Sequence, residues 1–452
     1  MSSDADLEAI ARRAVDAATS AGAGDAEAWV ERSTERQIRV YEAKVESLTD
    51  ATSAGVGIRA FIDGRVGYAF GTDTSDAGLA TVARAAHAAA AIADPDEYAG
   101  LPEESGSTPL EGLFSSKLAG WSTERKIDLA VAVERAARAH EGVSQVEDTV
   151  YSDGEGAVAI ANSRGFTDAY EVTSAWTYCS AFAGEGADRM TALGVGIGRD
   201  PGQIDPDEVG GEAGRRAVGL VGARQPASRR CPVVLDTFVA ASFVGFIGGM
   251  LSADAVQRGR SLFADRLGEE IADPLLRVAD DGTDPGGFAS GPFDGEGVAR
   301  RRTPLIEDGR LASFLYDSRT ARRGDTATTG NAERGSYRTP PGVGTSNLVL
   351  EAGDATLEEL IARCGDGLYV TDVAGLHSGV NPVSGTFSVG ATGRLISGGE
   401  LAEPVREITI ASDLVSMLRG VQAVGSELRW VPFGGSVRAA PLLLAEMAVS
   451  GS

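Results

Sequence analysis

Long strand-like runs near the N-terminus constrain the fold of this chain more than any other feature of its sequence. The runs EAWVERS and RQIRVYEAKVESL lead into AGVGIRAFIDGRVGYAF, where Asp63-Gly64 separates two alternating stretches. An Asp-Gly pair in that position is a strong β-hairpin signal. More strand-like sequence follows at AVAIANSRGFTDAYEVTSAWTYCSAFAG and DRMTALGVGIGRD, with a turn expected at residues 162–165. Strands therefore dominate this half of the chain.

Helical patterns gather in clusters around these runs instead of alternating with single strands. Apolar spacing and capping residues predict helices over 5–20 (capped by Ser3 or Asp4), 75–93, 123–140 (capped by Ser122), 206–221, 241–254 and 356–363. This arrangement predicts an α+β fold and not a βαβ fold. The polar segment ARQPASRRCP, residues 223–232, carries two prolines and is the expected linker. It divides an N-terminal α+β domain, residues 1–222, from a β-rich C-terminal domain, residues 233–452.

Charge and cysteine content limit the environment and the partners. The 452 residues carry a formal net charge of −24, which disfavours nucleic acid as a direct partner because phosphate binding needs a basic face. No signal peptide is evident, and the apolar runs fall short of the roughly 20 residues that span a bilayer. Cys179, Cys231 and Cys364 are odd in number and far apart. They fit a reducing compartment, so a cytoplasmic location without membrane contact is expected.

The sequence contains no complete catalytic motif. No lysine follows a glycine, so a P-loop is absent from the sequence. His140-Glu141 lacks the second histidine that a zincin needs, and His140 is expected at a helix C-terminus. His377 could join Asp372 and a serine in a hydrolase, but no GxSxG elbow accompanies it. A loop histidine near a cleft is favoured.

Acidic residues cluster at VADDGTD and FDGEGV in the C-terminal half. Their oxygen atoms could bind a divalent cation, but the surrounding glycines favour structural turns. We take five residues as candidate cleft residues: Asp254, Asp280, Asp281, Glu296 and His377.

Four blocks of the C-terminal half resemble the TldD/PmbA (modulator of DNA gyrase) family. They are IADPLLRVADDGTDPGG, FDGEGVARRRTPLIEDGRLASFLYDSRTARR, TTGNAERGSYRTPPGV and SGTFSVGATGRLISGGELAEPVREITIASDL. The resemblance is specific over residues 233–415 and extends, more weakly, over nearly the whole chain. It implies a two-domain fold with a sandwich-like N-terminal α/β domain and a strand-rich C-terminal domain.

The helix with Gly245, Gly248 and Gly249 indicates which kind of subunit this chain resembles. In the TldD kind, this helix carries the zinc motif HExxxH, and a later cysteine adds a ligand. Here Val244 and Gly249 stand at the two histidine positions, and Gly245 stands at the glutamate position. No cysteine follows Cys364. These residues offer none of the N, S or O donors that zinc requires. The chain therefore resembles the PmbA (TldE) kind.

The resemblance implies a catalytic role for a partner and none for this chain. We expect a subunit without catalytic residues, metal or other cofactor, paired with a TldD-like subunit that binds zinc and cleaves unfolded peptides. A homodimer is expected when that partner is absent. Two alternatives remain open: a stand-alone regulatory or peptide-binding homodimer, and a self-sufficient hydrolase that uses Asp280, Asp281, Glu296 or His377.

Overall fold

A long, curved antiparallel sheet forms the N-terminal half of the computed structural model, which describes residues 4–432 and 435–451. The sheet has six strands in the order β3-β2-β1-β4-β5-β6. Their bounds are β1 (Asp25–Tyr41), β2 (Lys44–Ile62), β3 (Arg65–Gly71), β4 (Val143–Asn162), β5 (Thr167–Ala183) and β6 (Met190–Gly198). Asp63 and Gly64 form the expected β2–β3 turn, both with positive φ, at 49° and 71°, as a type I′ turn requires.

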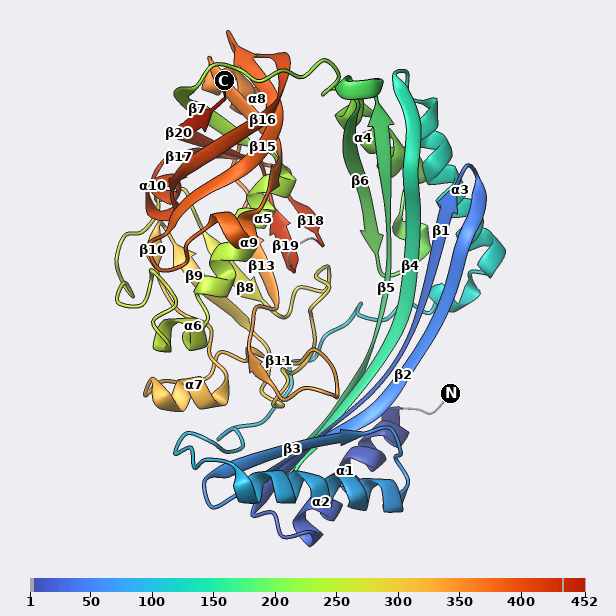
Figure 1. The fold of residues 1–452 in the computed structure, drawn as a ribbon. Helices are drawn as coiled ribbons and strands as arrows, with labels where there is room; N and C mark the ends of the chain where they lie inside the picture. The colour runs from blue at the N-terminus through green and yellow to red at the C-terminus, as the bar shows by residue number, and fades with distance from the viewer. Residues whose placement is uncertain (1–3, 433–434, 452) are drawn as a thin grey trace.

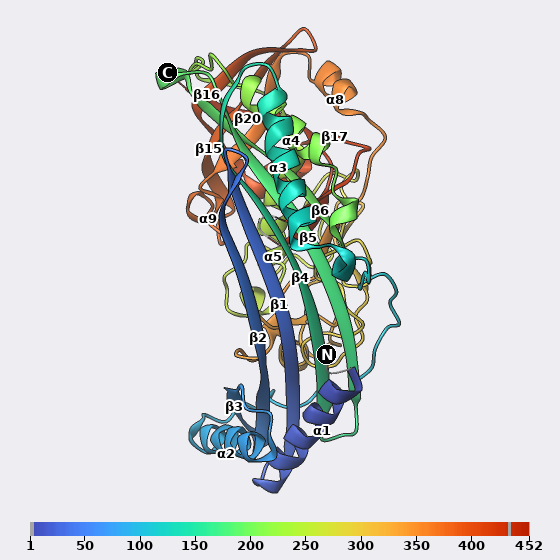
Figure 2. The same ribbon diagram turned by 90° about the vertical axis from the view of Figure 1, so that its right-hand side faces the viewer.

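Four helices cover one face of this sheet. They are α1 (Asp4–Ser20), α2 (Asp76–Ile92), α3 (Thr123–Ala139) and α4 (Pro206–Val218). Ala28 of β1 packs with α1 and α2, and Ile38 of the same strand packs with α3 and α4. Side chains alternate between faces along a strand, so both even-numbered residues point to one face. Figure 2 shows α3 and α4 across the upper part of the sheet and α1 across the lower part.

Two further sheets build the C-terminal half. One has the order β16-β15-β14-β7-β20-β17, with an additional β16–β20 pairing, and the other has the order β10-β9-β8-β13-β19-β18. The first contains β7 (Arg229–Leu235), β14 (Gly367–Ala374), β15 (Thr386–Ser397), β16 (Glu400–Asp413), β17 (Val421–Val424) and β20 (Leu442–Ser450). The second contains β8 (Val278–Asp281), β9 (Arg302–Glu307), β10 (Arg310–Leu311), β13 (Asn347–Leu350), β18 (Arg429–Val431) and β19 (Ser436–Ala439). A small pair, β11 (Ala332–Glu333) and β12 (Gly342–Val343), lies apart from both.

The helices of this half are shorter. They are α5 (Thr237–Met250), α6 (Ala253–Gln257), α7 (Ser318–Arg323), α8 (Leu357–Cys364), α9 (Leu376–Gly379) and α10 (Leu414–Arg419). The α5 residues Phe243 and Ile247 lie in one apolar core with side chains from both six-stranded sheets.

The α+β fold class is confirmed, and several boundaries differ from the expected ones. The apolar helix expected over 241–254 is two helices, because Ser252 is extended and its hydroxyl accepts the amide of Ala255 as a new N-cap. Strand β7 begins at Arg229, inside the segment expected to be a linker. Ser3, one candidate cap for the first helix, lies outside the described residues. Within 4–432 and 435–451, no helix is long and apolar enough to cross a bilayer.

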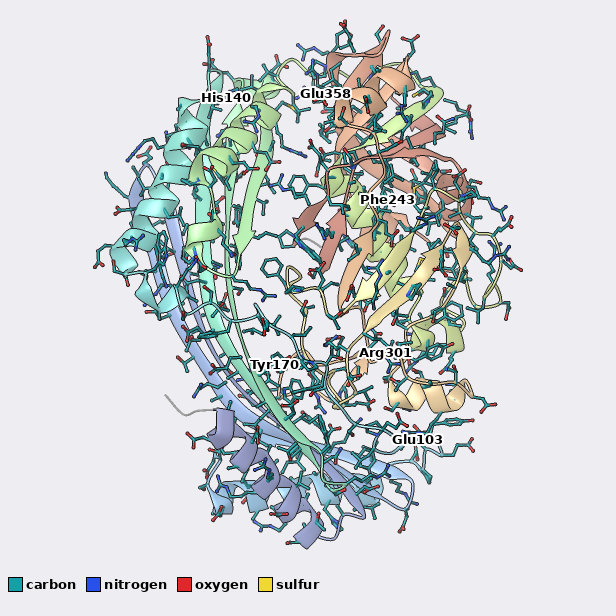
Figure 3. The ribbon with its side chains drawn as sticks, turned by 180° about the vertical axis from the view of Figure 1, so that it is seen from behind. Glu103, His140, Tyr170, Phe243, Arg301 and Glu358 are labelled. Atoms are coloured by element: carbon teal, nitrogen blue, oxygen red, sulfur yellow. The ribbon has the colours of Figure 1, made fainter. Side chains whose placement is uncertain are left out.

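Aromatic packing joins the two halves on the sheet face opposite the helices. Tyr170 of β5 meets Phe293 of the C-terminal half with ring centroids 5.1 Å apart, and Trp29 of β1 meets the same ring at 6.3 Å. Figure 3 shows Tyr170 on the side of the sheet that faces the C-terminal half.

Candidate functional site

Helix α5 lies at the junction between the two halves. Its N-cap, Asp236, accepts the amide of Phe238 and the hydroxyl of Tyr369, the latter at 2.7 Å. Arg216 of α4, in the N-terminal half, also pairs with Asp236 at 3.1 Å. The N-terminal end of α5 is thus fixed from both sides, which orients its partly exposed face toward the opening between the halves.

A cavity of about 420 Å³ occupies this opening. The N-terminal half contributes Glu147, Ser180, Thr191, Ala192, Leu193, Arg216 and Leu220, and the C-terminal half contributes Phe238, Val239, Ser242, Thr371, Asp372 and Val373. A second cavity of about 370 Å³ shares Arg216 and Phe238 with the first and is lined also by Glu208, Glu212 and Glu427. Together they form the interdomain cleft discussed below.

Arginine charges in the interdomain cleft are already neutralised by carboxylates. Burial alone would lower the pKa of Arg216, but Asp236 and Glu212 outweigh it and raise that pKa above its ordinary value. Arg429 pairs with Glu212 at 2.6 Å. The Arg216 and Arg429 guanidinium groups lie 4.7 and 5.0 Å from the ring centroid of Phe238.

Two carboxylates of the cleft form no salt bridge in the part of the chain that the structure describes. Glu147 and Asp372 line the larger cavity, and neither forms a salt bridge within the described residues. Glu147 accepts the hydroxyl of Ser180 at 2.8 Å. This end of the cleft therefore presents a negative surface to a ligand.

The three zinc-motif positions point to different sides of α5. Val244 is buried in the C-terminal core, with 7% of its surface exposed. Gly249 is exposed, and a Cβ built on it would meet no atom within 4 Å. In the described part of the chain, no three His, Cys, Asp or Glu side chains are grouped so that they could hold a metal ion. Residues 244, 245 and 249 do not fit zinc, because they have no donor atoms.

None of the five candidate cleft residues lines the interdomain cleft. Asp254 pairs with Arg258 on the surface at 2.8 Å, and His377 is exposed on α9. Asp281 accepts the amide and hydroxyl of Thr283 in a turn.

Asp280, another of these candidates, is 1% exposed and accepts hydrogen bonds from Asn331 and Ser346. Burial raises the pKa of Asp280 to about 6.

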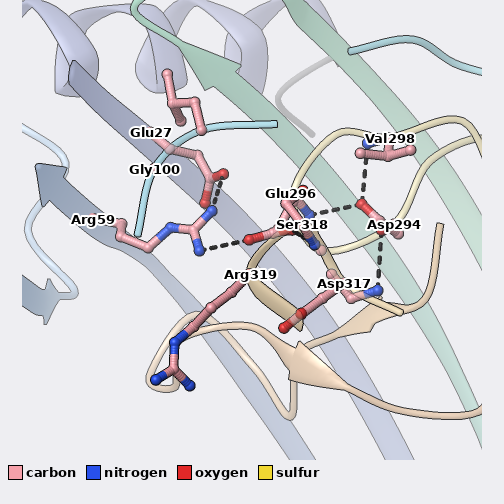
Figure 4. A network of polar contacts seen from close by, with 12 residues as sticks. Glu27, Arg59, Gly100, Asp294, Glu296, Val298, Asp317, Ser318 and Arg319 are labelled. Carbon is pink, nitrogen blue, oxygen red and sulfur yellow. Dashed lines mark hydrogen bonds and ion pairs between the residues drawn. The ribbon is translucent and has the colours of Figure 1, made fainter. Parts of the chain in front are cut away.

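Glu296 belongs to a buried charged network that joins the halves (Figure 4). Arg59 of β2 donates to Glu27 and to Glu296, each at 2.7 Å, and Arg334 also pairs with Glu27. Burial alone would raise the pKa of Glu296, but the charge of Arg59 holds it below its ordinary value. Burial and the Glu296 charge raise the pKa of neighbouring Asp294 to about 7. These side chains fix how the halves are joined.

No sequence pattern pointed to the residues of the interdomain cleft. Asp372 is the one exception, and it was a candidate only as a partner of His377 in a hydrolase. The lining of the larger cavity comes mostly from β4, β5, β6, α4, α5 and β14, and no short motif connects these segments. Only the helix of Gly245 and Gly249, which drew attention through its glycines, marked this region.

Three matches to known domains cover most of the sequence. Residues 26–93 match the PmbA/TldA metallopeptidase domain 1, residues 116–221 the central domain, and residues 228–451 the C-terminal domain. The chain belongs to the PmbA/TldD family. The resemblance identified from the four sequence blocks is thereby confirmed.

Two curated relatives match along nearly their whole length. The metalloprotease PmbA of Escherichia coli O157:H7 is 28% identical over 431 residues, which cover 94% of this chain and 92% of that protein. A metalloprotease PmbA homolog of Haemophilus influenzae is 26% identical over 446 residues, with 97% and 95% covered.

Solved structures share the fold. A putative modulator of DNA gyrase from Thermotoga maritima superposes with a TM-score of 0.88 at 25% identity, covering 97% of this chain and 99% of that chain. TldE from Thermococcus kodakarensis superposes with a TM-score of 0.91 at 21% identity and the same coverage. The second likeness concerns the fold alone.

Proposed function

We propose that this chain is the metal-free, PmbA/TldE-type subunit of a two-component metallopeptidase that cleaves unfolded peptides. The observation that carries the proposal is the identity of Val244, Gly245 and Gly249 on α5, which offer no zinc ligand where the TldD kind has HExxxH. The metal and the catalytic residues then belong to a TldD-like partner. The names of the curated relatives, which call them metalloproteases, support a role in proteolysis.

The fold supports a structural role for α5 in such a subunit. Phe243 and Ile247 keep the helix in the core of the C-terminal half. Gly249, near the C-terminal end of the helix, is exposed, and a Cβ built on it would meet no atom within 4 Å. A subunit of this kind keeps the helix for packing and completes a chamber for the substrate.

Reconstitution with a TldD-like chain from the same organism tests the proposal. We expect the two chains to copurify, and an unfolded substrate such as casein to be cleaved by the pair and not by this chain alone. A partner that is equally active without this chain would contradict the proposal and favour the stand-alone binding protein. Cleavage by this chain alone would favour a self-sufficient hydrolase.

A further inference from the structure

Strand β6 leaves one edge of the large sheet unpaired inside the interdomain cleft. It is the last strand of the order β3-β2-β1-β4-β5-β6, and its described partner is β5 alone. Thr191, Ala192 and Leu193 are consecutive residues, and all three line the larger cavity. Side chains of neighbouring residues point to opposite faces, so a cavity that reaches all three also reaches the strand edge.

The next residues along β6 show which backbone groups face that edge. The amide of Val195 donates to Glu212, and its carbonyl oxygen accepts from Arg429. Both groups of Val195 therefore point away from β5. Because backbone groups alternate along an antiparallel strand, those of Thr191 and Leu193 point the same way. Side chains therefore already form hydrogen bonds with the backbone of Val195 at this edge. The strand edge at residues 191–193 is open to the cavity.

The opposite wall of the cavity is the end of β14. Thr371, Asp372 and Val373 line it, and β14 pairs with β7 only as far as Val370. Asp372 stands here, and Glu147 stands on the wall formed by the large sheet. An extended chain that adds to β6 would therefore share the cavity with two carboxylates that form no salt bridge within the described residues.

We infer that this cleft holds an extended peptide as an added strand along the free edge of β6, and that it prefers a basic side chain beside Glu147 and Asp372. Backbone hydrogen bonds give affinity in such strand addition, and side-chain surroundings give preference. Low-dielectric walls concentrate the field of the two carboxylates in the cavity. The inference rests on the proposed function and names the class of peptide that this subunit would hold.

Fluorescence anisotropy with the full chain tests the charge preference. Two labelled ten-residue peptides of serine, threonine and valine carry either lysine or glutamate at alternate positions. We expect the lysine peptide to bind about tenfold more tightly at low ionic strength, with a smaller difference in high salt. The double variant Glu147→Gln/Asp372→Asn should remove most of that preference. The control Glu103→Gln, at an exposed carboxylate near α7 (Figure 3), should keep it.

N-methylation of the lysine peptide at alternate amides tests strand addition without changing the protein. We expect its affinity to fall about fivefold or more as backbone donors are lost. Leu193→Pro, which removes an amide at the free edge, should weaken both peptides. No peptide binding, equal binding of the two peptides, or no effect of N-methylation would overturn the inference. Failure of the proposed function would appear elsewhere, as a partner that neither copurifies nor needs this chain.

Discussion

Replacing Arg59 by methionine tests whether the buried charged network holds the two halves together. The Arg59 side chain is 9% exposed and bridges Glu27 of the N-terminal sheet and Glu296 of the C-terminal half, with each nitrogen–oxygen distance at 2.7 Å. Methionine keeps much of the side-chain volume but removes the charge. Glu27 retains Arg334 as a partner, whereas Glu296 keeps only the amide of Ser318 among these contacts.

The expected loss of stability follows from the burial of Glu296, whose side chain is 2% exposed. Removing one partner of a buried ion pair leaves an uncompensated charge and costs about 3–5 kcal/mol. Total unfolding free energies are roughly 5–15 kcal/mol, so the variant should be severely destabilised. The control Arg258→Met breaks the surface pair with Asp254, whose side chains are 48% and 40% exposed. It should cost no more than about 1 kcal/mol.

Urea unfolding followed by circular dichroism measures both variants. We also expect Arg59→Met/Glu296→Gln to recover part of the lost stability, because the unpaired buried charge is then gone. The sign of the pH effect follows from Glu296, whose folded pKa is depressed by Arg59. The stability that this pair gives is present above the unfolded pKa and is lost as pH falls through the folded pKa. Equal midpoints for Arg59→Met and Arg258→Met would refute the reasoning.

Three further predictions concern substitutions in α5 and β8. In thermal unfolding, Gly248→Ala should destabilise the chain by about 1–3 kcal/mol, because the new Cβ would collide with Leu348. Gly249→Ala should be neutral or stabilising by up to about 1 kcal/mol, because its Cβ would point into open space. Because the folded pKa of Asp280 is raised to about 6 from 3.8, the folded state keeps a proton that the unfolded chain releases, and stability should fall as pH rises through that range. Asp280→Asn should remove up to about 3 kcal/mol of that pH dependence, whereas Asp281→Asn should not. A triple variant that restores HExxxH should not hydrolyse an unfolded peptide with added zinc, since its first histidine would replace a residue that is only 7% exposed; turnover near that of an intact pair would contradict this.

Local signals in the sequence predicted most of the elements. The Asp63-Gly64 turn, the Ser122 cap of α3 and the helix after Thr356 all depend on neighbouring residues, and the structure contains each of them. Thr356 even forms a full capping box with Glu359. Short-range rules were sufficient there because the partners are a few residues apart.

Long-range contacts could not be predicted in the same way. Glu27 and Arg334 are 307 residues apart in the sequence, and nothing near either residue indicates the other. The glycines around Glu296 predicted a structural turn, and it lies in one, but nothing near it in the sequence indicates its burial against Arg59. The same limit applies to the larger cavity of the interdomain cleft, whose lining comes mostly from six separate strands and helices.

The zinc content of the purified chain tests the central claim most directly. Mass spectrometry of the metal, after mild chelation, should find less than one tenth of an equivalent in this chain alone and about one equivalent per TldD-like partner in the reconstituted pair. Zinc should stay at that level in the pair when Gly249→Ala is introduced here. One equivalent of tightly bound zinc in this chain alone would contradict the account.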